Sequence, residues 1–348
     1  MLKTDYIRNF VANHLRPYPQ VPTKITLIQW SILLLISIIS VCTTVGCTSK
    51  PGPERYEGID FLEMDSETRF LESAWSPDGQ KVVVRYEKGW LEDIGVAVID
   101  ITTGVFHPIL PEQEDTKFTP EWSPDSQSLI VTIYVERPTE DTPFNIGIVD
   151  AQSGQFQQEL WFGSAATWGS EPNKIIVIDN DIGHLKEQVP IFEIDLDSGK
   201  QRQFAQTEAA MVTVTDSFDV SSDGYLTVMN VDGLQIIDIE SGELIGVIDK
   251  RLRTPNWSPD GDMLVFTYDV SEDGEKIYHD HIFLSTADGS CFSDSLDLQS
   301  RIWTIDWSPD GQQLVFATFE PGKLYFMDLT IGVGKELIES FNANCIMD

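Results

Sequence analysis

A short motif recurs through the chain and restricts its fold more than any other feature. Four copies read Trp-Ser-Pro-Asp and begin at Trp75, Trp122, Trp257 and Trp307. Two degenerate copies keep the spacing, with Gly-Ser after Trp168 and Ser-Ser-Asp-Gly after Val220. The six positions are spaced on average about 46 residues apart. Self-similarity at such a period is typical of solenoids, propellers and other repeat architectures.

A second landmark alternates with the first. It is an apolar segment that ends in Asp, with Gly four residues later. The pairs are Asp100 with Gly104, Asp150 with Gly154, Asp195 with Gly199, Asp238 with Gly242, Asp328 with Gly332, and Ser285 with Gly289 in the fifth copy. Two independent landmarks that alternate six times indicate six copies of one structural unit.

The first landmark has the chemistry of a tight turn. Proline presets φ, aspartate bonds to nearby backbone, and glycine takes the positive φ that closes the turn. A catalytic group is needed only once, whereas these aspartates recur with their turns. We therefore assign a turn-stabilising role to Asp78, Asp125, Asp260 and Asp310.

Each turn is followed by apolar, β-rich segments such as KVVVRY from Lys81 and MLVFTYD from Met263. Such runs suit strands that are buried on both faces. Four antiparallel strands per repeat form the blade of a propeller. The sequence thus predicts an all-β, six-bladed β-propeller over residues 71–348, with almost no helix, and 335–339 in the last fourth strand. We expect the repeated tryptophans to wedge between blades, at Trp75, Trp122, Trp168, Trp257 and Trp307.

The repeats resemble those of TolB-like propellers, which read xWSPDGxxLxF and continue into a strand with D-x-x-x-G. The resemblance runs from about Leu71 to the C-terminus. It implies a propeller without two companions known from related chains. The residues before Leu71 are too few for the α/β domain that precedes the TolB propeller, and no G-x-S-x-G motif marks a hydrolase domain.

Residues 1–46 are predicted to be a signal peptide or membrane anchor. The uncharged segment from Ile25 to Val45 is long enough to span a bilayer, and the preceding residues are net basic. The sequence around Gly46 and Cys47 resembles a bacterial lipoprotein signal, which implies lipidation of Cys47. A cleaved lipoprotein and an uncleaved anchor both remain open, and both predict an extracytoplasmic, membrane-anchored body in the periplasm or at the cell surface.

Residues 47–70 contain Pro, Gly and many charged residues, and we interpret them as a tether. Within them, the segment from Ile59 to Leu62 is compatible with an additional strand. Only two cysteines, Cys291 and Cys345, belong to the propeller. Export would permit a disulfide between them, but their distance does not follow from the sequence, so the pairing stays open.

The charge excludes one class of partner. Residues 47–348 carry 19 Lys or Arg and 55 Asp or Glu, a net charge of −36. Binding to nucleic acids depends on neutralising phosphates with Lys and Arg, so we expect no nucleic-acid partner. Solubility in a salty habitat and attraction to a cationic partner both explain such a surface.

Candidate metal ligands are few. His279 and His281 would share a face of a strand, but a third protein ligand cannot be assigned from the sequence. The segment 179–183 lacks the spacing and closing Glu of a calcium loop. We therefore predict no metal site, no cofactor and no catalytic residue.

The loops between second and third strands are the predicted binding surface. They are long in blades one, two, three and five, and they lie on the face opposite the repeated turns. Aromatic and acidic residues gather in them, namely Trp90, Phe144, His184, Tyr278, Glu140 and Asp141. Such a surface suits a cationic or carbohydrate-like ligand.

The predicted function is a monomeric, non-catalytic binding or scaffolding module for a protein, peptide or glycan. The alternative is a propeller enzyme, similar to a polysaccharide lyase or glycoside hydrolase, with its active site at the mouth of the channel.

Overall fold

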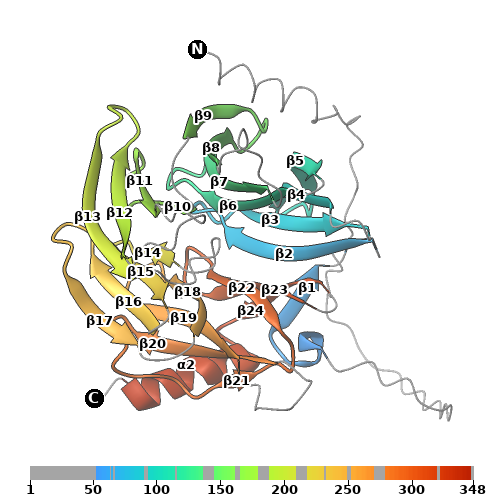
Figure 1. Ribbon diagram of the computed structural model, residues 1–348. Helices are drawn as coiled ribbons and strands as arrows, with labels where there is room; N and C mark the ends of the chain where they lie inside the picture. Colours follow the sequence, from blue (N-terminus) through green and yellow to red (C-terminus); the bar gives the residue numbers. More distant parts are fainter. Residues whose placement is uncertain are drawn as a thin grey trace, which may run out of the picture.

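The chain folds into six four-stranded antiparallel sheets arranged around a common centre (Figure 1). The computed structural model describes residues 52–62, 64–65, 67–89, 93–113, 116–135, 145–160, 165–178, 188–208, 218–230, 233–248, 252–269, 279–319 and 322–345. The prediction of an all-β, six-bladed propeller is confirmed.

Five blades are formed by consecutive strands, with the first strand innermost. Blade one contains β2 (Thr68–Trp75), β3 (Lys81–Lys88), β4 (Asp93–Asp100) and β5 (Phe106–Gln113). Blade two contains β6 (Thr116–Trp122), β7 (Ser128–Val135), β8 (Asn145–Asp150) and β9 (Phe156–Leu160). Blade three contains β10 (Ala165–Trp168), β11 (Lys174–Ile178), β12 (Gln188–Asp195) and β13 (Gln201–Glu208). Blade four contains β14 (Phe218–Val220), β15 (Tyr225–Asn230), β16 (Gly233–Asp238) and β17 (Leu244–Ile248). Blade five contains β18 (Leu252–Trp257), β19 (Met263–Asp269), β20 (Asp280–Thr286) and β21 (Leu296–Asp297).

Blade six closes the ring with a strand from the other end of the chain. Its inner strands are β22 (Ile302–Trp307), β23 (Gln313–Thr318) and β24 (Leu324–Asp328), and its outer strand is β1 (Ile59–Leu62). β1 pairs antiparallel with β24, as the blue and orange strands show in Figure 1. The compatibility of this segment with a strand is confirmed. The start of the propeller at residue 71 was placed too late, because β1 and the beginning of β2 lie in the segment assigned to the tether.

The C-terminal segment differs from the prediction. Residues 335–339 do not form the last fourth strand, because β1 occupies that position and the chain instead forms the helix α2 (Gly332–Cys345). Leu337 and Phe341 are buried against blades five and six. A disulfide between Cys345 and Cys291 joins the end of the helix to blade five, with Cα atoms 5.5 Å apart. A single-turn 3₁₀ helix, η1 (Pro53–Arg55), precedes β1.

The repeated turns have the expected hydrogen bonds. In the first turn, the Ser76 hydroxyl donates to Asp78 Oδ1 (2.6 Å) and accepts the amide of Lys81 (2.9 Å). The same serine–aspartate bond, also 2.6 Å, forms at Asp125, Asp260 and Asp310. Gly79 has the predicted positive φ, 69°. These bonds are the ones that the predicted turn-stabilising role of the four aspartates requires.

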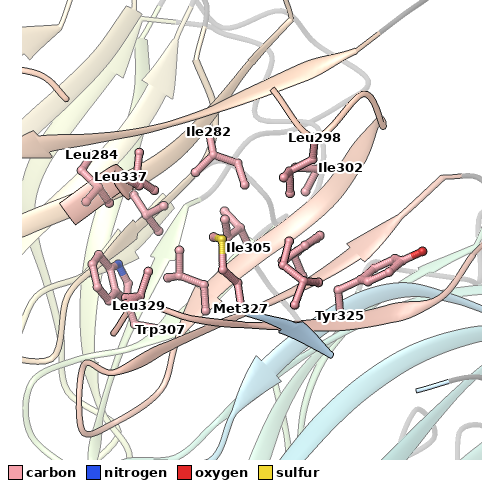
Figure 2. Packing of buried hydrophobic residues seen from close by; sticks show 14 of the residues in the cluster. Ile282, Leu284, Leu298, Ile302, Ile305, Trp307, Tyr325, Met327, Leu329 and Leu337 are labelled. Carbon is pink, nitrogen blue, oxygen red and sulfur yellow. The ribbon is translucent and has the colours of Figure 1, made fainter. Parts of the chain in front are cut away.

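The tryptophans lie in the seams between blades. Trp122 packs against Leu71 and Val83 of blade one, and Trp307 packs against Ile282 and Leu284 of blade five (Figure 2). All five are at most 8% exposed: Trp75, Trp122, Trp168, Trp257 and Trp307. Burial in the seams is what the predicted wedge role requires. In the seam between blades three and four, the smaller Val220 stands at the corresponding position.

We expect Trp257→Ala to lower the free energy of unfolding by about 3–5 kcal/mol, because it opens a cavity in a buried seam. Val220→Ala removes only two carbons at the same repeat position and should cost about 1–2 kcal/mol. Urea titration of both variants measures the difference. Equal losses would contradict the wedge role of the indole.

Candidate functional site in the central channel

The axis of the propeller contains a polar cavity of about 210 Å³. All six blades contribute to it through their innermost strands. Its most regular feature is a ring of residues that directly precede the landmark position of each repeat. They are Ala74, Glu121, Thr167, Asp219, Asn256 and Asp306.

The polar members of this ring connect each blade to the next. Asp219 Oδ2 of blade four accepts the amide of Trp257 of blade five (2.7 Å). Asp306 Oδ2 of blade six accepts the amide of Trp75 of blade one (2.8 Å), across the junction that closes the ring. Each carboxylate thereby satisfies a buried backbone donor that would otherwise destabilise the seam.

Two further ring members form equivalent bonds. Glu121 Oε1 of blade two accepts the hydroxyl of Thr167 of blade three. The side-chain amide of Asn256 in blade five donates to the carbonyl of Ile305 in blade six. In the first seam, the Trp122 indole donates to the carbonyl of Ala74 (3.1 Å). Residues at this position of the repeat thus link neighbouring blades by hydrogen bonds.

Three carboxyl groups at the axis have raised pKa values. Burial raises the pKa of Glu121 to about 8, with further contributions from the negative charges of Asp219 and Asp306. Burial likewise raises the pKa of Asp306 to about 7 and that of Asp219 to about 6. Accepted backbone hydrogen bonds partly oppose the shift in both aspartates. At neutral pH, Glu121 is therefore mostly protonated.

Sequence reasoning missed this ring. The chain contains 56 acidic residues, so no single carboxylate stood out by type. The signal that could have found it is positional: two Asp and one Glu precede the landmark position of three different repeats, at the inner end of the first strand.

The predicted binding residues lie outside the described part of the chain. This holds for Trp90, Phe144, His184, Tyr278, Glu140 and Asp141, and also for Cys47 and the apolar segment 25–45. The strand bounds do locate the loops that carry them. Long connections of nine residues separate β7 from β8 (136–144) and β11 from β12 (179–187).

One loop is shorter than predicted. β3 extends to Lys88 and β4 starts at Asp93, so four residues connect them in blade one. Ten residues, 270–279, connect β19 and β20 in blade five. Blades two, three and five therefore carry the long second-to-third connections. Blade one does not, because its strands pair further than the sequence indicated.

The two histidines of blade five share one face, as predicted. His279 Nδ1 and His281 Nε2 lie 3.8 Å and 3.9 Å from the two carboxylate oxygens of Asp297 on β21. Asp280, between them, is buried and accepts the amide of Ile302 (2.7 Å). Within the described ranges, no three His, Cys, Asp or Glu side chains are grouped so that they could hold a metal ion.

These features define a six-bladed β-propeller with a closed, hydrogen-bonded axis. Solved structures share this fold at low sequence identity. A chain of a mitotic checkpoint complex matches with a TM-score of 0.51 and 14% identity, over 85% of this chain and 98% of that one. TolB from Acinetobacter baumannii matches with a TM-score of 0.46 and 16% identity, over 76% of this chain and 55% of that one.

An oligogalacturonate lyase in complex with manganese matches with a TM-score of 0.45 and 14% identity, over 78% of this chain and 96% of that one. The match to the checkpoint-complex chain, with a TM-score above 0.5, supports the fold alone. The sequence matches no protein-family model and no curated protein. In the part of the chain that the structure describes, no helix has the length and apolarity needed to cross a membrane.

The raised pKa of Glu121 predicts a pH dependence of stability. The unfolded carboxyl ionises near pH 4.5, whereas the folded one ionises near pH 8. Between these values the unfolded state releases its proton first, so the contribution of Glu121 to stability falls as pH rises. Glu121→Gln keeps an acceptor for Thr167 but cannot ionise. We expect its melting temperature to exceed that of the wild type increasingly from pH 5 to pH 8.

Differential scanning fluorimetry at constant ionic strength measures this difference. Asp310→Asn, at an exposed turn on the surface, is the control for removing one acidic group. A difference between wild type and Glu121→Gln that stays constant over this pH range would contradict the assigned protonation of Glu121.

Proposed function

We propose that this protein is a non-catalytic binding or scaffolding module, anchored to a membrane on its extracytoplasmic side. Its ligand, a protein, peptide or glycan, binds on the face that carries the second-to-third connections. The anchor is the N-terminal segment, through lipidation of Cys47 or through an uncleaved apolar helix.

The distribution of connections between the two faces carries this proposal. On one face, the repeated turns are short and internally hydrogen-bonded in blade after blade. On the other, the connections of blades two, three and five are nine or ten residues long, while that of blade four contains only residues 231–232. A rigid scaffold does not need such long loops, and loops of this kind commonly carry binding residues.

The channel supports the same proposal, because two of its carboxylates already have structural partners. The carboxylates of Asp219 and Asp306 each accept an amide from the next blade. The cavity of about 210 Å³ is also smaller than the roughly 300–1,000 Å³ of most ligand pockets. A ligand bound by the surface loops therefore explains the long second-to-third connections, which a ligand bound in the channel would not.

One observation favours the enzymatic alternative, a polysaccharide lyase or glycoside hydrolase. Glu121, with a pKa of about 8, lines the channel and could serve there as a general acid. Loss of polysaccharide cleavage in Glu121→Gln, at unchanged stability at pH 5, would support it. Such a result would overturn the non-catalytic proposal.

A pull-down from intact cell envelopes tests the binding function. The bait is the chain from Cys47 to Asp348, compared with its Trp90→Ala/Phe144→Ala variant. We expect the double variant to lose capture of the recovered partner at least about tenfold, since aromatic residues commonly dominate interface energy. Its melting temperature should stay within about 2 °C of the wild type, because surface substitutions usually have small effects on stability.

Asp78→Ala and Asp310→Ala provide the matched controls on the opposite face. Both should retain capture, although each loses a turn hydrogen bond. If a folded Asp310→Ala protein loses the partner and the loop variant keeps it, the partner binds on the face of the repeated turns. The proposed binding face would then be wrong.

A further inference from the structure

The outer strand of blade four exposes an apolar surface. β17 reads Leu-Ile-Gly-Val-Ile, and three of its side chains are about half exposed: Leu244 (54%), Ile245 (52%) and Val247 (48%). β17 is the last strand of its sheet and has no strand beyond it among the described residues. Its outward backbone groups therefore form an open edge of the kind that other chains can join.

The other outer strands are protected against such pairing. β5 contains Pro108 and Pro111, which cannot donate to a neighbouring strand. β9 and β13 are rich in Gln, with Glu159 and Arg202 among them. β1 has the charged Asp60, and β21 is only two residues long, with Asn344 of α2 bonded to the nearby Asp294. β17 alone among them combines an apolar sequence with neither proline nor charge.

A groove lies beside this strand, in the seam between blades three and four. It has a volume of about 470 Å³ and lies between β13 on one side and β16 and β17 on the other. Phe204, Ile237 and Leu244 supply apolar surface, and the amides of Gln203, Gln206 and Gln235 supply neutral hydrogen-bonding groups. The groove lining contains no charged side chain.

The seam between blades three and four also differs from the other seams in its sequence. In five repeats an indole fills the seam before its blade, but in blade four the corresponding residue is Val220. Val220 packs against the same cluster of residues as Phe204 of the groove.

We propose that β17 and this groove bind an extended, cationic peptide segment of another protein, which adds to blade four as a fifth strand. Backbone hydrogen bonds to β17 would hold the segment, and alternate apolar side chains would contact Leu244 and Val247. Lys or Arg flanking the strand would meet the exposed Glu240 and Glu243, which lie on either side of Gly242 in the sequence, and Gly242 lines the groove. This mode of recognition takes its affinity from the main chain and its specificity from alternating side chains.

Charge and area favour such a segment over a second copy of the chain. Two copies would each carry a net charge of −33 and repel one another. Three half-exposed side chains also offer roughly a few hundred Å² of apolar surface, well below the about 1,200–2,000 Å² that stable protein interfaces bury. A single extended peptide needs far less area and supplies the missing positive charge.

Fluorescence anisotropy with a labelled probe peptide tests this proposal. The probe is acetyl-Lys-Lys-Thr-Val-Thr-Val-Thr-Lys-Lys-amide, and a second probe has Pro in place of the central Thr. The protein is the chain from Cys47 to Asp348, as wild type and as the Ile245→Lys/Val247→Lys variant. A matched control, Val105→Lys/Ile331→Lys, adds the same two charges at apolar residues that are 41% and 47% exposed elsewhere.

We expect the wild type and the matched control to bind the first probe with affinities within about threefold of each other, since their surfaces at β17 are identical. The β17 variant and the proline probe should each weaken binding at least about tenfold. Absence of binding to the wild type would overturn the proposal, as would equal weakening in both double variants or equal binding of the proline probe.

Sedimentation of the wild type and the β17 variant tests whether a second copy of the chain, rather than a peptide, occupies this edge. If the wild type forms a concentration-dependent dimer and the β17 variant does not, a second copy covers this edge. That result would also overturn the proposal. These outcomes do not depend on the loop face. Failure here leaves the proposed function standing, and the Trp90→Ala/Phe144→Ala test can fail while this one succeeds.

Discussion

Because every blade has apolar residues on both faces, no blade buries its surface alone, and the ring holds together only when the last blade also meets the first. That junction is made by β1, which pairs with β24 and covers it from the opposite end of the chain. Ile59 and Leu62, the ends of β1, are both buried at 7% exposure. Folding therefore requires that residues more than 250 apart in sequence come together, which makes closure the costliest contact to form.

The chemistry of the axis follows from the same requirement. Inner strands converge at the centre, where backbone amides at the seams need acceptors away from bulk water. Asp219 and Asp306 supply them, and Asp306 does so at the junction between the last blade and the first. The carboxyl groups thus contribute to ring integrity, and burial is the main cause of their raised pKa values.

Much of the fold could be predicted because each repeat carries its own local signals. Turn residues such as Asp78, and apolar strands such as that following Lys81, determine one blade without reference to the rest. β1 gave only a weak signal, since a four-residue strand containing Asp60 depends on its partner β24 for stability. The helix α2 was not predicted, because the repeat pattern indicated a fourth strand at residues 335–339. Its apolar positions Val333, Leu337 and Phe341 recur every four residues, which is a helical period.

The candidate site was predicted less well. Position within the repeat, rather than residue type, distinguishes Glu121 from the other acids, and the pairing of neighbouring blades becomes visible only in the fold. The apolar edge of β17 was missed for a related reason. LIGVI reads as a buried strand, and its exposure follows from being the outermost strand of its blade.

Thermal unfolding of two N-terminal truncations tests the central role of closure most directly. One chain begins at Gly52 and keeps β1, and the other begins at Met64 and lacks it; both retain the disulfide between Cys291 and Cys345. Loss of two buried aliphatic side chains, at about 1.5–3 kcal/mol each, together with a strand edge, should lower the melting temperature by more than about 10 °C. The longer chain should melt as the chain from Cys47 does. Equal melting of both truncations would show that the ring does not depend on β1.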